Sequence, residues 1–379
     1  MTRVLVNTVS LSSGALVRER HIVGELTKRD GPHEYEVLAT PATCEALGSQ
    51  SETVRLHEVP APEGTAERIW WENKDLRSHA NRLDADLLYF PLHITNFINS
   101  FPKVSAVRNA APFYPEAHAG ASARERLRLW ALWAATRRTI AQSEAVLFFS
   151  EATYERVTRS IPGAAEKGVV VPHGIPLGFE PIKPNREIYY AYNLPDRFLL
   201  SVSNIARYKN LLELVDGYAV AREQVDLPPL CLAGKVVDAG YERELRDLIA
   251  AHRLQDSFRL LGCVDHGDLP QLHSACDLFV FSSACENSPV TLVEALACGD
   301  AIACSNVASM PELCGDAAAY FDPYNPTDIG ATVADLWSDE QRRKRLETAA
   351  LRRAETFEWA EATEKISSIF TSVTREGRV

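Results

Sequence analysis

The sequence predicts an α/β protein made of two doubly wound domains, each built around a parallel sheet. Three observations support this prediction. Short apolar runs alternate with stretches of helical spacing, this alternation occurs in each half of the chain, and a segment rich in proline and glycine separates the halves. The chain has 379 residues, more than one ordinary core holds, since domains typically contain roughly 100 to 200 residues.

The first half contains apolar runs of strand length, each followed by a loop or a helical stretch. The expected strands are Val4–Asn7, Tyr35–Leu38, Leu87–Phe90, Val104–Val107 and Ala145–Phe149. Strands that alternate with helices form parallel sheets, so we expect one sheet in this half. From Val169 onward Pro and Gly become frequent, which predicts a domain boundary near residue 185.

The second half repeats the pattern more clearly. Its expected strands are Phe198–Val202, Leu230–Ala233, Phe258–Leu261, Leu278–Phe281 and Ala301–Cys304. Helical spacing occurs between them at Leu211–Arg222, Tyr241–His252 and Leu269–Ala275. The expected fold is therefore two Rossmann-like domains that face a central cleft. Residues 1–185 form the first domain, residues 186–358 the second, and residues 359–379 a terminal helix that packs back toward the first.

Composition and charge argue against several classes of protein. The 51 acidic residues outnumber the 40 lysines and arginines, and the formal charge of -11 disfavours nucleic acid binding. Met1–Asn7 leads directly into a strand-like run without a signal peptide, and no apolar span approaches the ~18 residues of a transmembrane helix. The eight cysteines form no Cys-x-x-Cys pair, so we expect reduced thiols in a cytoplasmic protein.

The segment from residue 278 to residue 299 carries the densest chemistry. An apolar strand runs into the turn Ser282–Asn287 and then into a helix. Ser288 is the expected cap of this helix, Pro289 its first residue, and Gly299 the residue past its last turn. A helix that starts at the carboxyl end of a parallel strand offers free amides to an anion. The amides expected to face a diphosphate are those of Ser288, Val290 and Thr291.

Two glutamates bracket this turn. Glu286 lies in the loop, and Glu294 lies about a turn and a half into the helix. Each carboxylate can accept two hydroxyl protons, so the pair suits the vicinal diols of a hexose and a ribose. On spacing alone, chance or a surface salt bridge explains the pair better, and a glutamate near a helix start is also favoured by the helix dipole.

The run Cys285–Gly299, Cys-Glu-Asn-Ser-Pro-Val-Thr-Leu-Val-Glu-Ala-Leu-Ala-Cys-Gly, resembles the signature of glycosyltransferase family 4, the group 1 type of retaining glycosyltransferases with the GT-B fold. The resemblance continues through Ser309–Ala318, Phe321–Pro323 and Phe357–Trp359. Upstream, Leu200–Asn210 is similar to the family's strand and loop that supply positive charge to the diphosphate. The resemblance covers residues 145–360 well and the amino-terminal half only in outline.

The resemblance implies that the carboxyl-terminal domain binds the nucleotide sugar and the amino-terminal domain binds the acceptor. It further implies that Glu286 contacts the donor sugar, that Glu294 contacts the ribose, and that the turn Leu261–Val264 lies along the nucleobase. The expected donor-binding residues are Asn204, Arg207, Lys209, Val264, Glu286, Asn287, Ser288, Val290, Thr291 and Glu294.

One position departs from the family pattern. Lys209 matches the family lysine, whereas Asn204 stands five positions earlier, where the family usually has arginine. Asparagine can hydrogen-bond a phosphate but cannot neutralise it. Arg207 either replaces that arginine or is a solvated loop charge.

The acceptor side carries fewer signals. Gly14 follows the first strand and either permits close approach of a ligand or belongs to an ordinary capped turn. His93 follows the strand Leu87–Phe90 and is a candidate base or sugar contact, the alternative being a surface histidine. Where many family members have a histidine, this chain has Arg108 and Asn109, and Asn109 is expected to bind sugar hydroxyls. The expected catalytic residues are Glu286, Lys209 and His93.

Residues 124–138 form a basic helical stretch with two tryptophans. Peripheral contact with an anionic membrane surface is one interpretation. The favoured interpretation packs Trp130 and Trp133 into the core of the amino-terminal domain and leaves the arginines solvated.

No metal and no cofactor are expected. Asp84–Asp86 matches an Asp-x-Asp metal motif, but it precedes its strand instead of following it. The expected reaction moves a hexose-type sugar from a nucleotide diphosphate, uridine before guanosine, to an acceptor hydroxyl with retention by front-face displacement. The acceptor is a glycan, a lipid-linked sugar or a small metabolite. The alternatives are a nucleotide-sugar epimerase on the same fold and a non-catalytic nucleotide-sugar binding protein.

Overall fold

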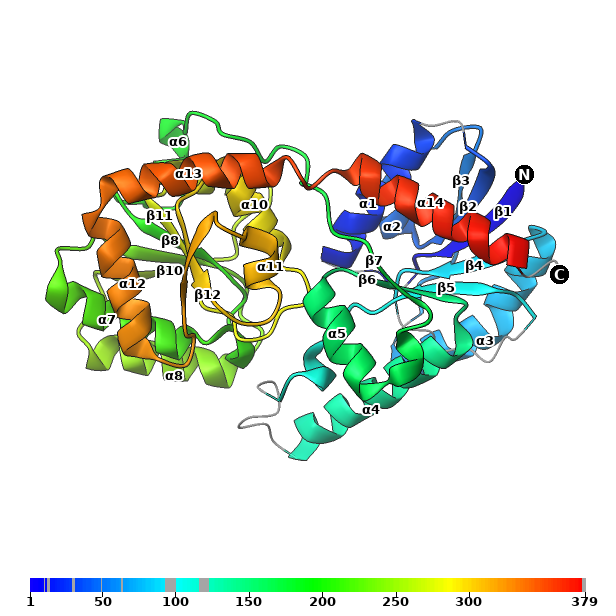
Figure 1. Cartoon of the computed structure of the whole chain (residues 1–379), viewed down its shortest axis with the longest axis horizontal. Coiled ribbons are helices and arrows are strands. Elements are labelled where there is room, and N and C mark those ends of the chain that lie inside the picture. The colour runs from blue at the N-terminus through cyan, green and yellow to red at the C-terminus, as the bar shows by residue number, and fades with distance from the viewer. Residues whose placement is uncertain are drawn as a thin grey trace. The chain divides into compact units, whose positions relative to one another are not determined.

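The computed structural model describes residues 1–9, 11, 14–28, 31–48, 50–62, 64–92, 100–115 and 123–376 (Figure 1). The chain divides into two compact units. Unit 1 comprises Met1–Gly174 and Glu358–Val379, and unit 2 comprises Ile175–Phe357. Each unit is built on a parallel sheet with helices on its faces, which confirms the predicted class of two Rossmann-like domains.

The sheet of unit 1 has seven strands within the described residues, in the order β3-β2-β1-β4-β5-β6-β7. Its strands are β1 (Thr2–Asn7), β2 (His33–Ala39), β3 (Val54–Glu58), β4 (Leu87–Phe90), β5 (Lys103–Ala106), β6 (Ala145–Phe148) and β7 (Gly168–Val170). Its helices are α1 (Gly14–Thr27), α2 (Pro41–Leu47), α3 (Thr65–Arg82), α4 (Ala123–Gln142), α5 (Glu151–Ser160) and α14 (Trp359–Glu376). The strand order reverses between β1 and β4, so this is the topological switch point of unit 1.

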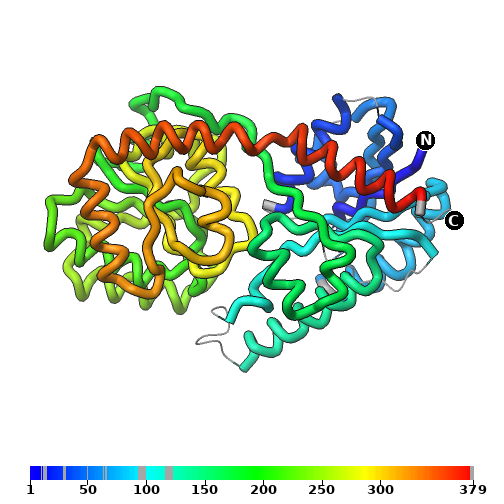
Figure 2. Tube along the Cα trace, viewed as in Figure 1, coloured from blue at the N-terminus to red at the C-terminus, as the bar shows by residue number. Residues whose placement is uncertain are grey.

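The last helix of the chain completes the core of unit 1. Figure 2 shows α14, in red, beside α1, in blue. Trp359 stacks on His21 with ring centroids 4.9 Å apart. A Cβ atom on Gly174 would lie 2.5 Å from Trp359, so the chain can pass this ring only with a glycine.

The chain crosses between the units at Gly174–Ile175 and again at Phe357–Glu358. The backbone N–H of Ile175 donates to the carbonyl of Phe357 at 3.1 Å, so the two ends of unit 2 are joined. The sequence pattern placed the boundary near residue 185. In the structure Phe179 is buried in the core of unit 2, which assigns residues 175–185 to that unit.

The sheet of unit 2 has six strands in the order β10-β9-β8-β11-β12-β13. Its strands are β8 (Leu199–Val202), β9 (Leu230–Ala233), β10 (Phe258–Gly262), β11 (Leu278–Phe281), β12 (Ile302–Ser305) and β13 (Ala318–Phe321). Its helices are α6 (Arg186–Ala191), α7 (Leu211–Gln224), α8 (Ala239–Ala251), α9 (Leu269–Ala275), α10 (Val290–Cys298), α11 (Met310–Cys314), α12 (Pro326–Ser338) and α13 (Glu340–Ala354). The order reverses between β8 and β11, which makes their carboxyl ends the switch point of unit 2.

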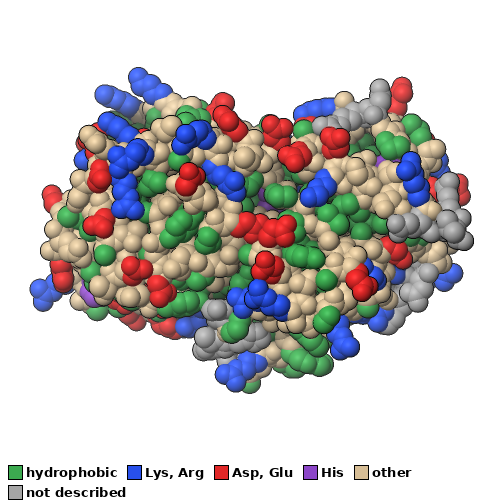
Figure 3. Space-filling view, in the orientation of Figure 1, with side chains coloured by type: hydrophobic (Ala, Val, Ile, Leu, Met, Phe, Trp, Pro, Cys, Tyr) green, Lys and Arg blue, Asp and Glu red, His purple; other side chains and the backbone are tan. Residues whose placement is uncertain are grey.

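Helix α4 corrects the expectation for Trp130, whereas Trp133 packs against the core as expected. Leu129 and Ile140 are buried, but Leu127 and Trp130 are 65% and 63% exposed. Trp133 is half-buried beneath the Arg137 guanidinium, whose carbon lies 5.8 Å from the ring centroid. Trp130 is therefore a surface residue. On the face shown in Figure 3, acidic and basic side chains are interspersed.

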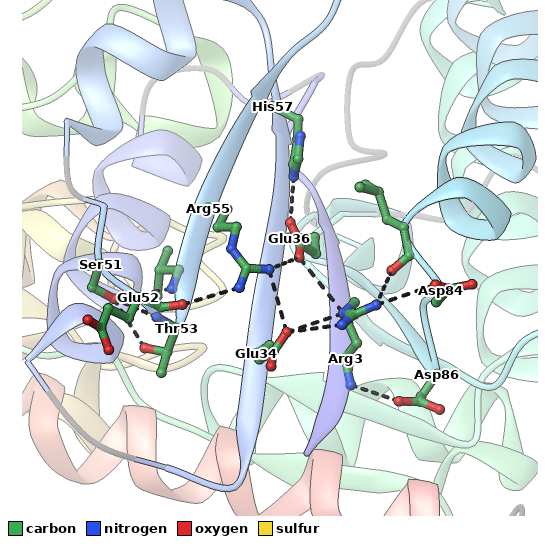
Figure 4. A network of polar contacts seen from close by, with 12 residues as sticks. Arg3, Glu34, Glu36, Ser51, Glu52, Thr53, Arg55, His57, Asp84 and Asp86 are labelled. Atoms are coloured by element: carbon green, nitrogen blue, oxygen red, sulfur yellow. Dashed lines mark hydrogen bonds and ion pairs between the residues drawn. The ribbon is translucent and has the colours of Figure 1, made fainter.

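A network of charged side chains joins β1, β2 and β3 (Figure 4). The buried Glu36 carboxylate accepts from Arg55 Nη1 at 2.6 Å and contacts His57 Nε2 at 2.5 Å. Arg3 contacts Glu34 Oε2 at 3.2 Å and donates to the carbonyl of Leu83 at 2.9 Å, and its backbone N–H donates to Asp86. These contacts explain how a strand as polar as β3 pairs with β2 at the edge of the sheet. The contact to Asp86 also gives the Asp-x-Asp sequence a structural role at the start of β4.

We expect Glu36→Gln to lower the free energy of unfolding by about 1 to 3 kcal/mol, because it removes the charge that holds Arg55 and His57. Glu34→Gln, which changes a more exposed carboxylate of the same strand, is the matched control and should cost less than about 1 kcal/mol. Differential scanning calorimetry measures both. Equal losses in the two variants would contradict the central role of Glu36.

Candidate functional site

The candidate site of unit 2 lies where the loops after β8 and β11 meet. The hydroxyl of Ser282 donates to the carbonyl of Lys209 at 2.8 Å, and the N–H of Ala284 donates to the carbonyl of Tyr208 at 2.9 Å. From the far side, Ser305, at the end of β12, donates to the carbonyl of Ser283 at 2.6 Å. The turn after β11 is therefore held by hydrogen bonds from two neighbouring strands.

Lys209 and Glu286 form an ion pair across these two loops. Lys209 Nζ lies 2.5 Å from Glu286 Oε1, and the side chains are 11% and 14% exposed. The Ser283 hydroxyl donates to the same carboxylate oxygen at 2.7 Å. Burial opposes the charge on Lys209, but attraction to Glu286 outweighs it and raises the pKa of Lys209 above its ordinary value. The structure thus brings two predicted site residues together as an ion pair with little exposure to solvent.

The start of α10 differs from the prediction in one detail. The helix begins at Val290 with Pro289 at the cap position, so Ser288 does not cap it. The Ser288 hydroxyl is buried and has no hydrogen-bond partner. Gly299 takes the expected left-handed conformation after the last turn, with φ of 77°.

The first amides of α10 are available to a ligand. The first backbone hydrogen bond at this end runs from Leu292 N–H to the carbonyl of Pro289, at 3.1 Å. Among the described residues, the amides of Val290 and Thr291 make no backbone hydrogen bond. Free amides at a helix start attract an anion through their N–H groups and through the helix dipole. They follow directly on the turn that carries Glu286.

Glu294 lies deeper in the site. Its buried carboxylate contacts His266 Nε2 at 3.1 Å, and the His266 ring packs edge-on against Phe179 with centroids 5.2 Å apart. His266 belongs to the loop after β10, which also holds the half-buried Val264. Sequence reasoning missed His266, because its only signal was a position two residues beyond the predicted nucleobase turn. The loop and the helix are therefore linked at Glu294.

Arg207 and Asn204 take positions outside the ion pair. Arg207 contacts Glu244 at 2.6 Å and Asp238 at 3.4 Å, both at helix α8 or its cap. Asn204 is exposed in the loop after β8. A Cβ atom on Gly234 would lie 1.9 Å from the carbonyl oxygen of Ser203, so this glycine permits the close approach of the two loops. In this structure Lys209, and not Arg207, is the cation paired with Glu286.

The remaining predicted residues belong to unit 1. Gly14 is the first residue of α1, at the switch point of the sheet. Asn109 accepts from the N–H of Ala111 at 3.0 Å, which stabilises the turn after β5. His93 lies outside the described residues. These positions are not in the unit that holds Lys209 and Glu286.

Comparison with solved structures defines the class of fold. The chain superposes on sucrose-phosphate synthase from Thermosynechococcus elongatus with a TM-score of 0.78 and 15% identity, covering 99% of this chain and 100% of that one. It superposes on WaaG, a glycosyltransferase involved in lipopolysaccharide biosynthesis, with a TM-score of 0.72 and 18% identity, covering 97% and 99%. The fold is GT-B.

Comparison with family models locates one match in unit 2. Residues 190–353 match the family model of the glycosyl transferases group 1. A serotype-specific mannosyltransferase, WbdA of Escherichia coli, is 34% identical over 171 residues, which are 45% of this chain and 21% of WbdA. The O-antigen chain mannosyltransferase B of Escherichia coli is 30% identical over 168 residues, 44% of this chain and 43% of that protein. The chain thus spans about a fifth of the first relative and less than half of the second.

None of the helices in the described part of the chain is both long and apolar enough to span a bilayer.

We expect Lys209→Met to destabilise unit 2 by about 3 kcal/mol, because it leaves the Glu286 carboxylate buried without its cation. The double variant Lys209→Met/Glu286→Gln should recover more than half of this loss, since neutral side chains of similar volume replace the whole pair. Calorimetric melting temperatures measure both effects. Independent, additive losses would show that the two side chains are not coupled.

The pH dependence of this stabilisation follows from the raised pKa of Lys209. A raised folded-state pKa means that the stabilisation is fully present below the ordinary lysine value of 10.5 and is lost as the pH rises through the folded value. Wild type and double variant should therefore converge in melting temperature only above about pH 10.5. Convergence near neutral pH would contradict the assignment.

Proposed function

We propose that the chain is a retaining glycosyltransferase whose unit 2 binds a nucleotide diphosphate sugar. The observation that carries the proposal is the Lys209–Glu286 ion pair, placed directly before the free amides of α10. The pair offers a cation for phosphate and a carboxylate for sugar hydroxyls at one switch point. The match of residues 190–353 to the group 1 model supports the same function.

Donor binding begins with an exchange of partners. The diphosphate takes the ammonium of Lys209 together with the amides of Val290 and Thr291. Glu286 then loses its ion pair and accepts hydrogen bonds from hydroxyls of the donor sugar, while the Ser283 hydroxyl keeps the carboxylate oriented. Asn204 and Asn287 add neutral hydrogen bonds, and Arg207 would have to leave Glu244 to contribute.

The transfer step breaks the bond between the anomeric carbon and the phosphate oxygen and forms the bond to the acceptor oxygen on the same face of the sugar. The leaving diphosphate accumulates negative charge, which Lys209 and the helix amides stabilise. The same diphosphate accepts the proton of the acceptor hydroxyl. This arrangement calls for no metal ion, so a chelator should leave turnover unchanged.

The remaining donor contacts follow from the loop after β10. Glu294, held by His266, accepts hydroxyls of the ribose, and the backbone near Val264 lies along the base. The names of WbdA and mannosyltransferase B favour a mannosyl donor, whereas structures of Anabaena HepE, 18% identical, contain UDP. We propose uridine first and guanosine second as the base. Gly14, His93 and Asn109 are proposed to contact the acceptor.

Glu286→Gln should lower the rate of transfer about a hundredfold or more, because an amide cannot replace the charged acceptor that orients the sugar. Lys209→Met should lower it similarly and also weaken binding of the free nucleoside diphosphate. The measurement is release of nucleoside diphosphate from UDP- and GDP-sugars in the presence of acceptor sugars. Glu242→Gln on α8, where Glu242 pairs with Arg246, is the matched control and should leave the rate unchanged.

Three other outcomes would overturn the proposal. Conversion of a nucleotide sugar without any acceptor would identify an epimerase. Tight binding of nucleotide sugar without release of nucleoside diphosphate, for every acceptor tried, would identify a binding protein. Full activity of both variants would move the site elsewhere.

We also propose that α4 contacts an anionic lipid surface. Leu127 and Trp130 lie one turn apart and expose apolar surface. Arginines surround them on the same helix, and of these Arg128 pairs with Glu125 at 2.6 Å. An exposed tryptophan among arginines is typical of helices that lie in a membrane interface.

Wild-type protein should sediment with phosphatidylcholine vesicles that contain phosphatidylglycerol and should remain in the supernatant with phosphatidylcholine alone. Leu127→Ser/Trp130→Ala should lose most of this binding, because it removes the apolar contact. Trp70→Ala removes an exposed tryptophan from α3 and serves as the control. Binding that ignores lipid charge, or that survives the double variant, would contradict this role of α4.

A further inference from the structure

A cluster of charged side chains lies at the switch point of unit 1, the unit that does not contain Lys209 and Glu286. We define the Arg18 cluster as Arg18, Glu19, Tyr89, Arg108, Phe149 and His173. Its members come from α1, from β4, and from the segments directly after β5, β6 and β7. The carboxyl ends of parallel strands share one edge of the sheet, and in doubly wound sheets this edge at the switch point is where ligands bind.

The contacts within the cluster are close. Arg18 Nη1 lies 2.8 Å from Glu19 Oε1 and 3.3 Å from the hydroxyl of Tyr89. The guanidinium carbons of Arg18 and Arg108 lie 4.5 and 5.4 Å from the centroid of Phe149. The ring of His173 packs against Phe149 with centroids 4.9 Å apart. Both guanidinium groups therefore lie near the same aromatic ring, that of Phe149.

The cluster combines charged groups with a neutral imidazole. Arg18 and Arg108 bring positive charges, and Glu19 brings a negative charge. Burial, together with the two arginines, holds the pKa of His173 well below its ordinary value, so the imidazole is neutral. Burial and the charge of Arg18 lower the pKa of Arg108 to about 10, which leaves it charged at neutral pH.

The hydrogen-bonding atoms of the cluster are also incompletely used. Arg18 is 1% exposed, yet its Nε and Nη2 atoms have no hydrogen-bond partner. Glu19 Oε2 and His173 Nδ1 are buried without a partner as well. Nε and Nη2 form one edge of the guanidinium and present two parallel donors, the arrangement that fits an oxyanion. A free carboxylate oxygen beside them fits a hydroxyl donor.

We propose that the Arg18 cluster is the subsite for an oxyanion on a hydroxylated acceptor, a sugar that carries a phosphate or a carboxylate. Arg108, which is half-buried, meets the anion at the surface, and Arg18 supplies the two-donor edge behind it. Glu19 accepts a hydroxyl of the same molecule. The claim that the bound molecule is the acceptor substrate rests on the proposed function. The claim that the site binds an oxyanion rests on the contacts of the Arg18 cluster alone.

The test measures binding without turnover. Wild type is titrated with glucose 6-phosphate, glucuronate and glucose in a thermal-shift assay. One or both anionic sugars should raise the melting temperature by at least about 2 °C, and glucose should not. The anion that gives the shift distinguishes phosphate from carboxylate. A shift with neither would overturn the proposal, even if transfer activity is present.

Variants separate an anion site from a structural cluster. Arg108→Met should weaken the apparent affinity for the anionic sugar at least tenfold, and Arg18→Lys, which keeps the charge but loses the two-donor edge, should do the same. Arg137→Met, on α4, removes another arginine that lies over an aromatic ring and should change nothing. Unchanged binding in Arg108→Met would overturn the proposal, whether or not Arg18→Lys folds.

Competition with UDP decides which substrate carries the anion. UDP and the anionic sugar should bind together, with additive shifts in melting temperature. Displacement of the sugar by UDP would assign the cluster to the donor diphosphate and overturn the acceptor assignment. Anionic-sugar binding without any transfer would instead overturn the proposed function and leave the subsite standing.

Discussion

The ion pair between Lys209 and Glu286 is the interaction on which the candidate site depends. The two residues are 77 positions apart, and they meet because β8 and β11 are neighbours at the reversal of strand order in unit 2. With side chains so little exposed, water screens their attraction weakly, so each holds the loop of the other in place. The free amides of α10 follow from the same turn. This electrostatic contact thus joins a cation and a carboxylate directly before a helix start.

Much of the fold could be predicted because apolar strands of parallel sheets are continuous runs, as in Leu87–Phe90 and Leu278–Phe281. Strand β3 could not be predicted, because its sequence Val-Arg-Leu-His-Glu is mostly polar. The partners of its charged side chains, such as Glu36, are distant in sequence. Strand β7 has only three residues in a segment that leads into prolines and glycines, and β13 lies inside the run that resembles the family motif. The exposure of Trp130 also depended on packing that helical spacing does not contain.

The candidate site could be predicted where its chemistry lies in one continuous motif. Glu286 and Lys209 belong to two such segments, and the structure joins them. Glu294 could be named from the motif, but its partner His266 comes from the loop after another strand. Arg18 had no signal at all, because one arginine in a helix is ordinary and its meaning comes from Glu19, Tyr89 and Phe149 around it. Local sequence patterns therefore predict motif residues. They do not predict which side chains surround a buried charge, because those side chains come together only when the sheet is formed.

The hydrogen bond between Ile175 and Phe357 brings together the two points at which the chain passes between the units. Unit 2 is an insertion into unit 1, and the segments by which the chain enters and leaves it are joined by one backbone hydrogen bond. An inserted domain whose ends meet can be exchanged for another, or shortened to a few linking residues, while the host keeps its own ends in place. Recombination at these two points would pair one host unit with different inserted units. The match to the family model of the glycosyl transferases group 1, residues 190–353, lies within the inserted unit.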